Sequence, residues 1–312
     1  MARSMSIIIE LENLLKSDPR RAERLFERLV AQMRPLDVAF EVLVLHDPDD
    51  VTADAVEALL LRSGVAPAEV TIVPAPGKRY YELKNLGAER ARGELVLFVD
   101  SDLIPEEGFL RSMIGAFDDP EVEVVAASPY VDPCRTLFEK SFALFWLFPL
   151  RSQGGPLEPI REYAANSVAF RRELFLRQPF PDSPCYRRQC ALQAKALMAE
   201  GHQLWGNPEA RVQHPPPRTW RDAIARALRE GRDRYFDRRM SGTAPAKNPV
   251  TAARGMQRSM SALGERMRTH AARVGLSQRE MPAALAIAAT YELAVRAGFV
   301  ATWISPRLTP DK

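Results

Sequence analysis

The front of the chain alternates between short apolar runs and stretches with helical spacing. The short, continuous apolar runs predict strands covered on both faces, at residues 6–9, 40–45, 70–73 and 95–99. Apolar residues recur at helical spacing over residues 18–33, 52–63 and 80–92, with Gly93 as a cap for the third helix. This order predicts an α/β fold with a mostly parallel sheet and helices on both faces.

The pattern changes after residue 120. A strand at 122–127 is followed by an aromatic-rich segment at 135–150, a Gly/Pro loop at 153–159, a strand at 164–171 and a helix at 190–200 closed by Gly201. After the proline run at 215–217, we expect a basic helix at 218–240, a linker at 241–249 and two further helical stretches. We therefore expect an α/β domain over residues 1–216 and a helical, basic C-terminal extension over 217–312.

Charge is divided unevenly along the chain. Residues 1–130 hold 14 Lys/Arg against 24 Asp/Glu, whereas residues 131–312 hold 29 against 16, and the whole chain carries +3. The acidic part suits a cation or a metal-bridged anion, and the basic part suits phosphate groups, a polyanion or an anionic membrane face.

Cysteine usage and hydropathy favour a reducing compartment. The cysteines are three in number and none has C-x-x-C spacing, so a disulfide framework or zinc site is not expected. The start of the chain does not resemble a signal peptide, and the most apolar stretch, residues 282–304, is interrupted by Glu292 and Arg296. We expect a cytoplasmic protein that is either soluble or peripheral on the inner face of the membrane.

Carboxylates stand at the ends of two predicted strands. Asp100 and Asp102 follow the run at 95–99 directly, and Asp47 follows the run at 40–45. A carboxylate at the end of a buried strand needs a partner, and ligands of such sheets bind beyond the carboxyl ends of the strands. These aspartates are therefore candidates for a binding site, although a solvated turn is the simpler alternative.

Several segments in order resemble glycosyltransferase family 2, whose members have the GT-A fold and use nucleotide-sugar donors. The D-x-D pair at Asp100 and Asp102 is one landmark, and by itself it is weak. The others are SIIIELEN, EVLVLHDPDD, KNLGAERARGE, AANSVAFRRELF and ALMAEGHQLWGNPEARVQH. The resemblance covers residues 5–216. It implies inverting transfer of a sugar from a nucleotide-diphosphate sugar, with uridine as the expected nucleoside.

A metal requirement follows from the resemblance and suits the chemistry. Charge builds on the diphosphate as the glycosidic bond breaks, and Mg²⁺ or Mn²⁺ held by hard oxygen ligands neutralises it. The resemblance implies Asp102 as the first metal ligand and His214 as a further metal or phosphate contact. Asp100 is expected at the ribose or at water beyond the metal's own ligands.

The resemblance also implies a set of nucleotide contacts. Asp47 and Glu12 are candidates for reading the base, and Leu11 for offering backbone groups to it. Lys84 matches a basic position that faces the nucleotide, with Asn85 holding its loop; a solvated helix lysine is the alternative. Glu12 stands where the family usually has an aromatic residue, and the residue at position 10 departs from the usual proline.

The catalytic base is missing from its usual place. The family has a Glu-Asp pair about twelve residues before the glycine that corresponds to Gly201, and here Gln189 and Cys190 stand there. Three interpretations stay open. Asp182 moves in as the base; the protein binds a nucleotide sugar without efficient transfer; or the acceptor is acidic enough or brings its own base.

The acceptor is a glycan, a lipid or a small molecule that the sequence does not identify. Asn166 and Trp146 are acceptor-side candidates, although core packing is the alternative for the aromatic segment around Trp146. Eight arginines and a helical apolar spacing over residues 218–240 suit an anionic membrane face, or a helix packed on the catalytic domain.

Two other functions compete with a transferase. A non-catalytic or weakly active nucleotide-sugar-binding scaffold is favoured by Gln189 and Cys190. A nucleotidyltransferase would need a Gly-rich phosphate loop near the first strand, and residues 6–18 have none. Nucleic acid is not an expected partner, because the basic tail has no recognisable module.

Overall fold

The structure is a computed structural model of the whole chain, and it describes residues 4–14, 17–146, 148–240, 261 and 263–305. The chain forms two compact units. The first comprises residues 1–130, 151–181 and 190–214, and the second comprises residues 131–150, 182–189 and 215–312. The second unit thus includes two short stretches of the predicted α/β domain, residues 131–150 and 182–189. The division at residue 216 stays a prediction.

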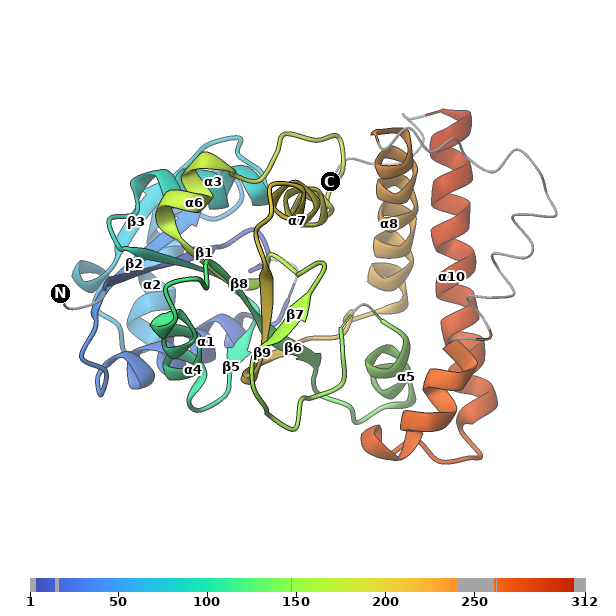
Figure 1. Cartoon of the computed structure of the whole chain (residues 1–312). Coiled ribbons are helices and arrows are strands. Elements are labelled where there is room, and N and C mark those ends of the chain that lie inside the picture. Colours follow the sequence, from blue (N-terminus) through green and yellow to red (C-terminus); the bar gives the residue numbers. More distant parts are fainter. Residues whose placement is uncertain (1–3, 15–16, 147, 241–260, 262, 306–312) are drawn as a thin grey trace. The chain divides into compact units, whose positions relative to one another are not determined.

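A sheet forms the centre of the first unit (Figure 1). Among the described residues its order is β3-β2-β1-β4-β8-β6-β9-β5, and β7 pairs with β9. The strands are β1 Ser4–Glu10, β2 Ala39–His46, β3 Thr71–Pro74, β4 Leu95–Asp100, β5 Ile104–Pro105, β6 Val124–Val131, β7 Glu158–Ile160, β8 Ser167–Arg171 and β9 Leu204–His214. The sheet is mixed, because β1 to β4 run parallel and the pairs of β8 with β4 and β6, and of β9 with β5 and β7, are antiparallel.

Helices cover both faces of this sheet, as the sequence predicts (Figure 1). Ile7 and Ile9 of β1 are buried with residues of α1, α2 and α4, whereas Ile8 is buried with residues of α3, α6 and α7. This alternation follows from the two-residue period of a strand. The helices are α1 Pro19–Met33, α2 Ala53–Arg62, α3 Tyr80–Arg90, α4 Phe109–Gly115, α6 Arg172–Arg177 and α7 Gln189–Ala199, with short 3₁₀ turns η1 Pro67–Glu69 and η2 Ala116–Asp118.

Local signals set the starts of the first two helices. Asp18 accepts a hydrogen bond from the Arg20 amide ahead of α1, and Thr52 does the same for Ala55 at α2. The predicted cap at Gly93 is wrong, because α3 already ends at Arg90. A β-carbon at Gly93 would stand 2.6 Å from the Ser6 backbone nitrogen, so this glycine is required by a close approach of the chain to β1.

The second unit consists of helices. They are α5 Leu137–Phe145, α8 Trp220–Met240, η3 Ala271–Val274 and α10 Met281–Ile304, and residues 263–270 are also helical. A β-carbon at Gly231 of α8 would lie 1.9 Å from the Val295 carbonyl oxygen, and one at Gly298 of α10 would lie 2.1 Å from the Leu228 carbonyl oxygen. These glycines therefore let α8 and α10 pack backbone to backbone. The predicted linker at 241–249 lies outside the described residues.

Candidate functional site

The carboxyl ends of β1, β2 and β4 meet at one edge of the parallel half of the sheet. Glu10, the last residue of β1, is paired in register with both Leu45 of β2 and Asp100 of β4. Asp47 follows β2 by one residue, and Asp102 follows β4 by two. The tertiary structure therefore brings the predicted strand-end aspartates to a common edge, where ligands of α/β sheets bind.

The Asp100 carboxylate is held by three protein side chains. It accepts hydrogen bonds from the Tyr80 hydroxyl at 2.7 Å, the Lys84 ammonium at 2.8 Å and the Asn13 amide at 3.0 Å. Asp100 is 3% exposed and Lys84 is fully buried. The alternative of a solvated Lys84 is therefore wrong, because its charge is neutralised inside the protein by Asp100.

A second buried carboxylate lies beside Asp100. Glu10 is fully buried, and it accepts hydrogen bonds from the Asn13 side chain at 3.1 Å and the Glu12 amide at 2.8 Å. The Asn13 amide thus bridges two carboxylates. Sequence analysis missed the roles of Asn13 and Tyr80, although Tyr80 stands four residues before Lys84 and therefore on the same face of α3.

Asp47 ties together two loops at the same edge. Its carboxylate accepts hydrogen bonds from the backbone amides of Gly77 at 3.0 Å and Asp49 at 3.1 Å. The neighbouring Leu11 is buried and donates its amide to the Leu45 carbonyl, and Glu12 is half-buried. Asp47 and Leu11 are therefore held in place by the protein's own backbone, and their contacts with a base stay predictions.

Two asparagines connect this edge to neighbouring segments. Asn85 exchanges hydrogen bonds with the backbone of Phe180, donating at 2.9 Å and accepting at 3.1 Å. It therefore fixes the loop before residue 181 against α3. Asn166 is buried, and its backbone carbonyl accepts a hydrogen bond from the backbone amide of Asp100 at 2.8 Å. Asn166 therefore lies directly beside the D-x-D turn.

Asp102 and His214 belong to two segments that one arginine joins. Asp102 is 8% exposed and His214 is 4% exposed. The Arg21 guanidinium donates from Nε to the Asp102 carbonyl at 2.6 Å and from Nη2 to the Gln213 carbonyl at 2.8 Å. Because Gln213 precedes His214 in β9, this arginine links the backbones of the two predicted metal ligands. No local pattern in the chain signals this contact.

The donor set at this turn suits a cation that arrives with phosphate. Across the described part of the chain, no group of three or more His, Cys, Asp and Glu side chains is arranged to hold a metal ion. Asp102 offers carboxylate oxygens and His214 an imidazole nitrogen, which is too few ligands for a resident ion. Mg²⁺ and Mn²⁺ readily take their other ligands from phosphate and water, so these residues fit a cation bound together with a diphosphate.

The place of the family's base holds an amide and a thiol where a carboxylate is usual. Gln189 is buried, and its amide donates to the Cys185 carbonyl at 2.8 Å. Cys190 is buried as well and accepts a hydrogen bond from the Tyr81 hydroxyl at 3.2 Å. Asp182 is exposed and belongs to the second unit. Its assignment as the base therefore stays a prediction.

Arginines of α8 cover aromatic rings within the second unit. Trp146 is 2% exposed, and the Arg226 guanidinium lies 4.3 Å from the centre of its ring. Arg229 lies over the Tyr186 ring at 5.2 Å in the same way. Phe142 and Phe148 also pack against Trp146, so the core-packing interpretation describes this residue. Arg226 and Arg229 of α8 are thus engaged inside the unit, whereas Arg221, Arg238 and Arg239 of the same helix are exposed.

Helix α10 is apolar on its outer as well as its inner face. Its length and composition are sufficient to cross a membrane, and 28% of its most apolar window is buried. Its large exposed apolar side chains are Leu293, Val300, Trp303 and Ile304.

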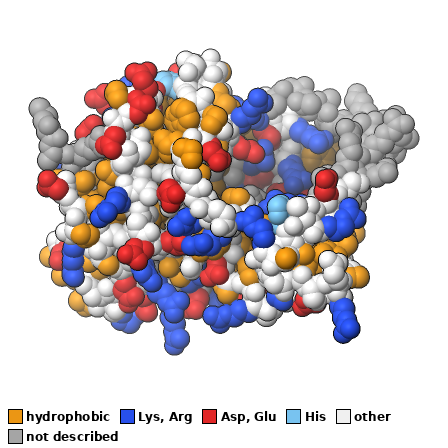
Figure 2. All heavy atoms as spheres, turned by 60° about the horizontal axis from the view of Figure 1, so that its bottom comes forward, with side chains coloured by type: hydrophobic (Ala, Val, Ile, Leu, Met, Phe, Trp, Pro, Cys, Tyr) orange, Lys and Arg blue, Asp and Glu red, His pale blue; other side chains and the backbone are white. Residues whose placement is uncertain are grey.

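On the face of the molecule shown in Figure 2, Lys/Arg and Asp/Glu side chains are interspersed, so the sign of the surface charge on that face is mixed.

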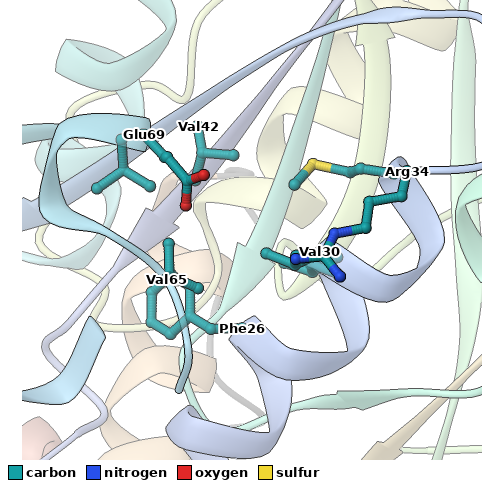
Figure 3. A pocket seen from close by; sticks show the side chains of 9 residues that line it. Phe26, Val30, Arg34, Val42, Val65 and Glu69 are labelled. Atoms are coloured by element: carbon teal, nitrogen blue, oxygen red, sulfur yellow. The ribbon is translucent and has the colours of Figure 1, made fainter. Parts of the chain in front are cut away.

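A separate cavity of about 270 Å³ lies between α1, β2 and η1. Phe26, Val42 and Val65 line it, and Arg34 and Glu69 reach it from opposite sides (Figure 3). None of the predicted site residues lines this cavity. It is therefore not part of the strand-end site.

Comparisons with known proteins agree with this geometry. A family model described as "Glycosyl transferase family 2" matches residues 17–176, just over half of the chain. A similar solved structure is the mannosyltransferase PcManGT from Pyrobaculum calidifontis in complex with GDP-Man and Mn²⁺. The two are 18% identical with a TM-score of 0.59, over 98% of this chain and 88% of that one. No curated protein sequence matches the chain.

Proposed function

The chain belongs to glycosyl transferase family 2, and on that premise we propose that it transfers a sugar from a nucleotide-diphosphate sugar to an acceptor hydroxyl with inversion at the anomeric carbon. The observation that carries the proposal is the cluster of buried carboxylates at the carboxyl ends of β1, β2 and β4. This is the edge at which α/β sheets bind nucleotides.

In the proposed complex the donor nucleoside lies along the ends of β1 and β2. Asp47 and Glu12 recognise the base, Leu11 contacts it, and Asp100 contacts the ribose. Lys84 and Tyr80 hold the Asp100 carboxylate in a fixed orientation, and Asn85 fixes the adjoining loop. Uridine is the expected nucleoside, and the GDP-Man bound by the similar mannosyltransferase makes guanosine the alternative to test.

We place the diphosphate at the turn after β4. Asp102 and His214 would hold Mg²⁺ or Mn²⁺ there, and the bound cation would neutralise the charge that develops on the leaving diphosphate. Support comes from the hard donor atoms at this turn and from the Mn²⁺ in the similar mannosyltransferase complex. The protein's own part is to hold a carboxylate and an imidazole ready, which limits reorganisation during the reaction.

We place the acceptor near Asn166, which lies beside the D-x-D turn. Trp146 is the weaker acceptor-side candidate, because its side chain is 2% exposed and Arg226 lies over its ring. Asp182 is our candidate for the base that takes the proton from the acceptor hydroxyl, since Gln189 cannot remove a proton. The acceptor is a glycan, a lipid or a small molecule.

We further propose that the protein associates peripherally with an anionic membrane surface on the cytoplasmic side. The supporting observation is the set of exposed apolar side chains on α10, which ends in Trp303 and Ile304. Of the arginines of α8, Arg226 and Arg229 give less support than the sequence indicates, because they lie over aromatic rings. Co-sedimentation with vesicles containing phosphatidylserine tests this, and Trp303→Ser is expected to reduce binding.

A second candidate function is nucleotide-sugar binding without efficient transfer. Gln189 and Cys190 favour it, because both are buried at the family's base position and neither offers a carboxylate. The two candidates predict the same donor binding and differ in turnover.

Isothermal titration and a hydrolysis assay separate these possibilities. Wild-type protein is expected to bind UDP or GDP with heat that depends on Mn²⁺, and Asp102→Asn is expected to lose that dependence. The exposed Asp37→Asn is the matched control for charge removal. Slow, Mn²⁺-dependent release of UDP or GDP from a donor sugar would exclude the pure binding protein, and absence of metal-dependent binding in folded wild type would exclude the metal-dependent transferase.

A further inference from the structure

Arg21 makes a two-armed contact that the proposed reaction does not by itself explain. Its Nε and Nη2 atoms donate to two backbone carbonyls, those of Asp102 and Gln213, at 2.6 Å and 2.8 Å. The two acceptors are far apart in sequence and belong to the segments that carry the predicted metal ligands. A guanidinium presents its donors in a fixed fork, so it sets the separation of the two carbonyls.

The strand pairing at this point is short. β5 consists of Ile104 and Pro105, paired with Gln213 and Val212 of β9. Pro105, which has no N–H, stands at a position that does not hydrogen-bond to β9, because the next residue, Glu106, donates its amide to the Arg211 carbonyl at 3.0 Å. Arg21 adds two hydrogen bonds at the end of the ladder that leads to Asp102 and His214.

The first turn of a helix is an unfavourable place for a cation such as the Arg21 side chain. Arg21 stands in the first turn of α1, which holds no acidic residue, and a cation there is opposed by the helix dipole. The neighbouring Arg20 shares this position but is exposed. Arg21 breaks the usual preference against cations in the first turn of a helix, and its half-buried side chain binds two specific acceptors. Both features indicate a role in the surrounding structure.

We propose that Arg21 is the positioning residue of the metal site, which holds the Asp102 turn against the end of β9 so that Asp102 and His214 bind one cation. This inference rests on the proposed metal-dependent function. The contacts that give Arg21 this role are its two hydrogen bonds to the backbone carbonyls of Asp102 and Gln213. We call the two hydrogen bonds of Arg21 the clamp. Loss of the clamp leaves Asp102 and His214 in the chain, and it lowers the fraction of time during which both are close enough to bind one cation.

The test measures Mn²⁺ binding directly, by electron paramagnetic resonance in the presence of UDP or GDP. Arg21→Ala is expected to weaken Mn²⁺ affinity about 10- to 100-fold, the range typical of residues that orient metal ligands. Arg20→Ala removes the same charge from the same helix turn and is expected to leave the affinity unchanged. Arg21→Lys keeps the charge, but its Mn²⁺ affinity is expected to be as weak as that of Arg21→Ala, because one ammonium group cannot reproduce the two fixed donors of a guanidinium.

Hydrogen exchange in the metal-free protein gives a second measurement. Peptides covering residues 100–106 and 211–215 are expected to exchange faster in Arg21→Ala than in Arg20→Ala. Circular dichroism shows whether each variant is folded, and Arg21→Gln replaces Arg21→Ala if the latter is not.

The outcomes separate the clamp from the function on which it rests. If folded wild type binds no Mn²⁺ with either nucleotide, the proposed metal-dependent function is wrong, and the inference about Arg21 falls with it. If wild type binds Mn²⁺ and Arg21→Ala binds it equally well, the function survives and the inference about Arg21 is overturned. Tighter Mn²⁺ binding in Arg21→Ala would also overturn it, since that result indicates charge repulsion and not positioning.

Discussion

The strand-end cluster of the first unit and the arginine-rich helix α8 of the second use charge in different ways. At the strand ends, carboxylates are paired with a buried lysine and held by hydrogen bonds at a binding edge. On α8, arginines lie over aromatic rings, as Arg226 does over Trp146. Charge counted along the sequence therefore does not say which charges are available to a ligand. In this chain the acidic part forms the candidate site, and arginines of the basic part such as Arg226 and Arg229 lie over aromatic rings.

The largest expected effect is on the buried ion pair of the first unit. Asp100→Asn leaves the Lys84 ammonium buried without its counter-charge, since the two side chains are 4% and 0% exposed. The unfolding free energy is expected to fall by about 3 kcal/mol, measured by urea denaturation. Asp37→Asn, on the surface, is the control. A loss below about 1 kcal/mol would show that the pair contributes little and would weaken the comparison.

The next effect tests steric packing in the second unit. Gly231→Ala places a β-carbon 1.9 Å from the Val295 carbonyl oxygen, and backbone atoms cannot easily move aside. We expect a loss of about 1–3 kcal/mol in thermal or urea unfolding. Gly264 is the matched control, because a β-carbon added there would meet no atom within 4 Å and alanine favours a helix. Equal stabilities for the two variants would contradict the close helix contact.

A smaller effect concerns Glu106, a carboxylate of the first unit paired with arginines near the surface. It accepts hydrogen bonds from Arg151 at 2.7 Å, Arg211 at 3.0 Å and the Tyr130 hydroxyl at 2.5 Å. Despite the opposing effect of burial, these partners lower the pKa of Glu106 from 4.5 to about 2. Because the pKa is lower in the folded state, the stabilisation is present above pH 4.5 and is lost as pH falls towards 2.

Glu106→Gln is expected to lower stability at pH 7 by about 1 kcal/mol, a value kept small because Arg151 is half exposed and water screens the pair. The difference between wild type and variant should shrink between pH 4.5 and 2. Unfolding curves at a series of pH values measure it. A difference that stays constant with pH would show that the charge of Glu106 does not contribute.

The smallest effect tests the stacked arginines. Arg226→Gln removes the cation over Trp146 and is expected to reduce stability by about 0.5–1 kcal/mol. Arg221, exposed on the same helix, is the control, and Arg221→Gln is expected to be neutral. If both variants leave stability unchanged but weaken binding to anionic vesicles, these arginines serve a surface and the contrast between the two units is wrong.

Periodicity predicted the front half of the fold well. The four parallel strands and α1 to α3 have strong apolar patterns and helix-start signals, such as Asp18 and Thr52, that act within a few residues. The antiparallel part was harder to predict. β5 is two residues long, and β9 contains a glycine, a proline and several polar residues. Such strands are defined by their neighbours, so local sequence gives little sign of them.

The sequence by itself determined the α/β class, the family and the carboxylates at the strand ends, because apolar period and motif order are local properties of the chain. Only the tertiary structure decided which partner each charge has. It buried Lys84 against Asp100, set Arg226 on Trp146 and brought Arg21 to the carbonyls of Asp102 and Gln213. These contacts join residues distant in sequence, and their energies depend on burial and geometry that exist only once the chain has folded.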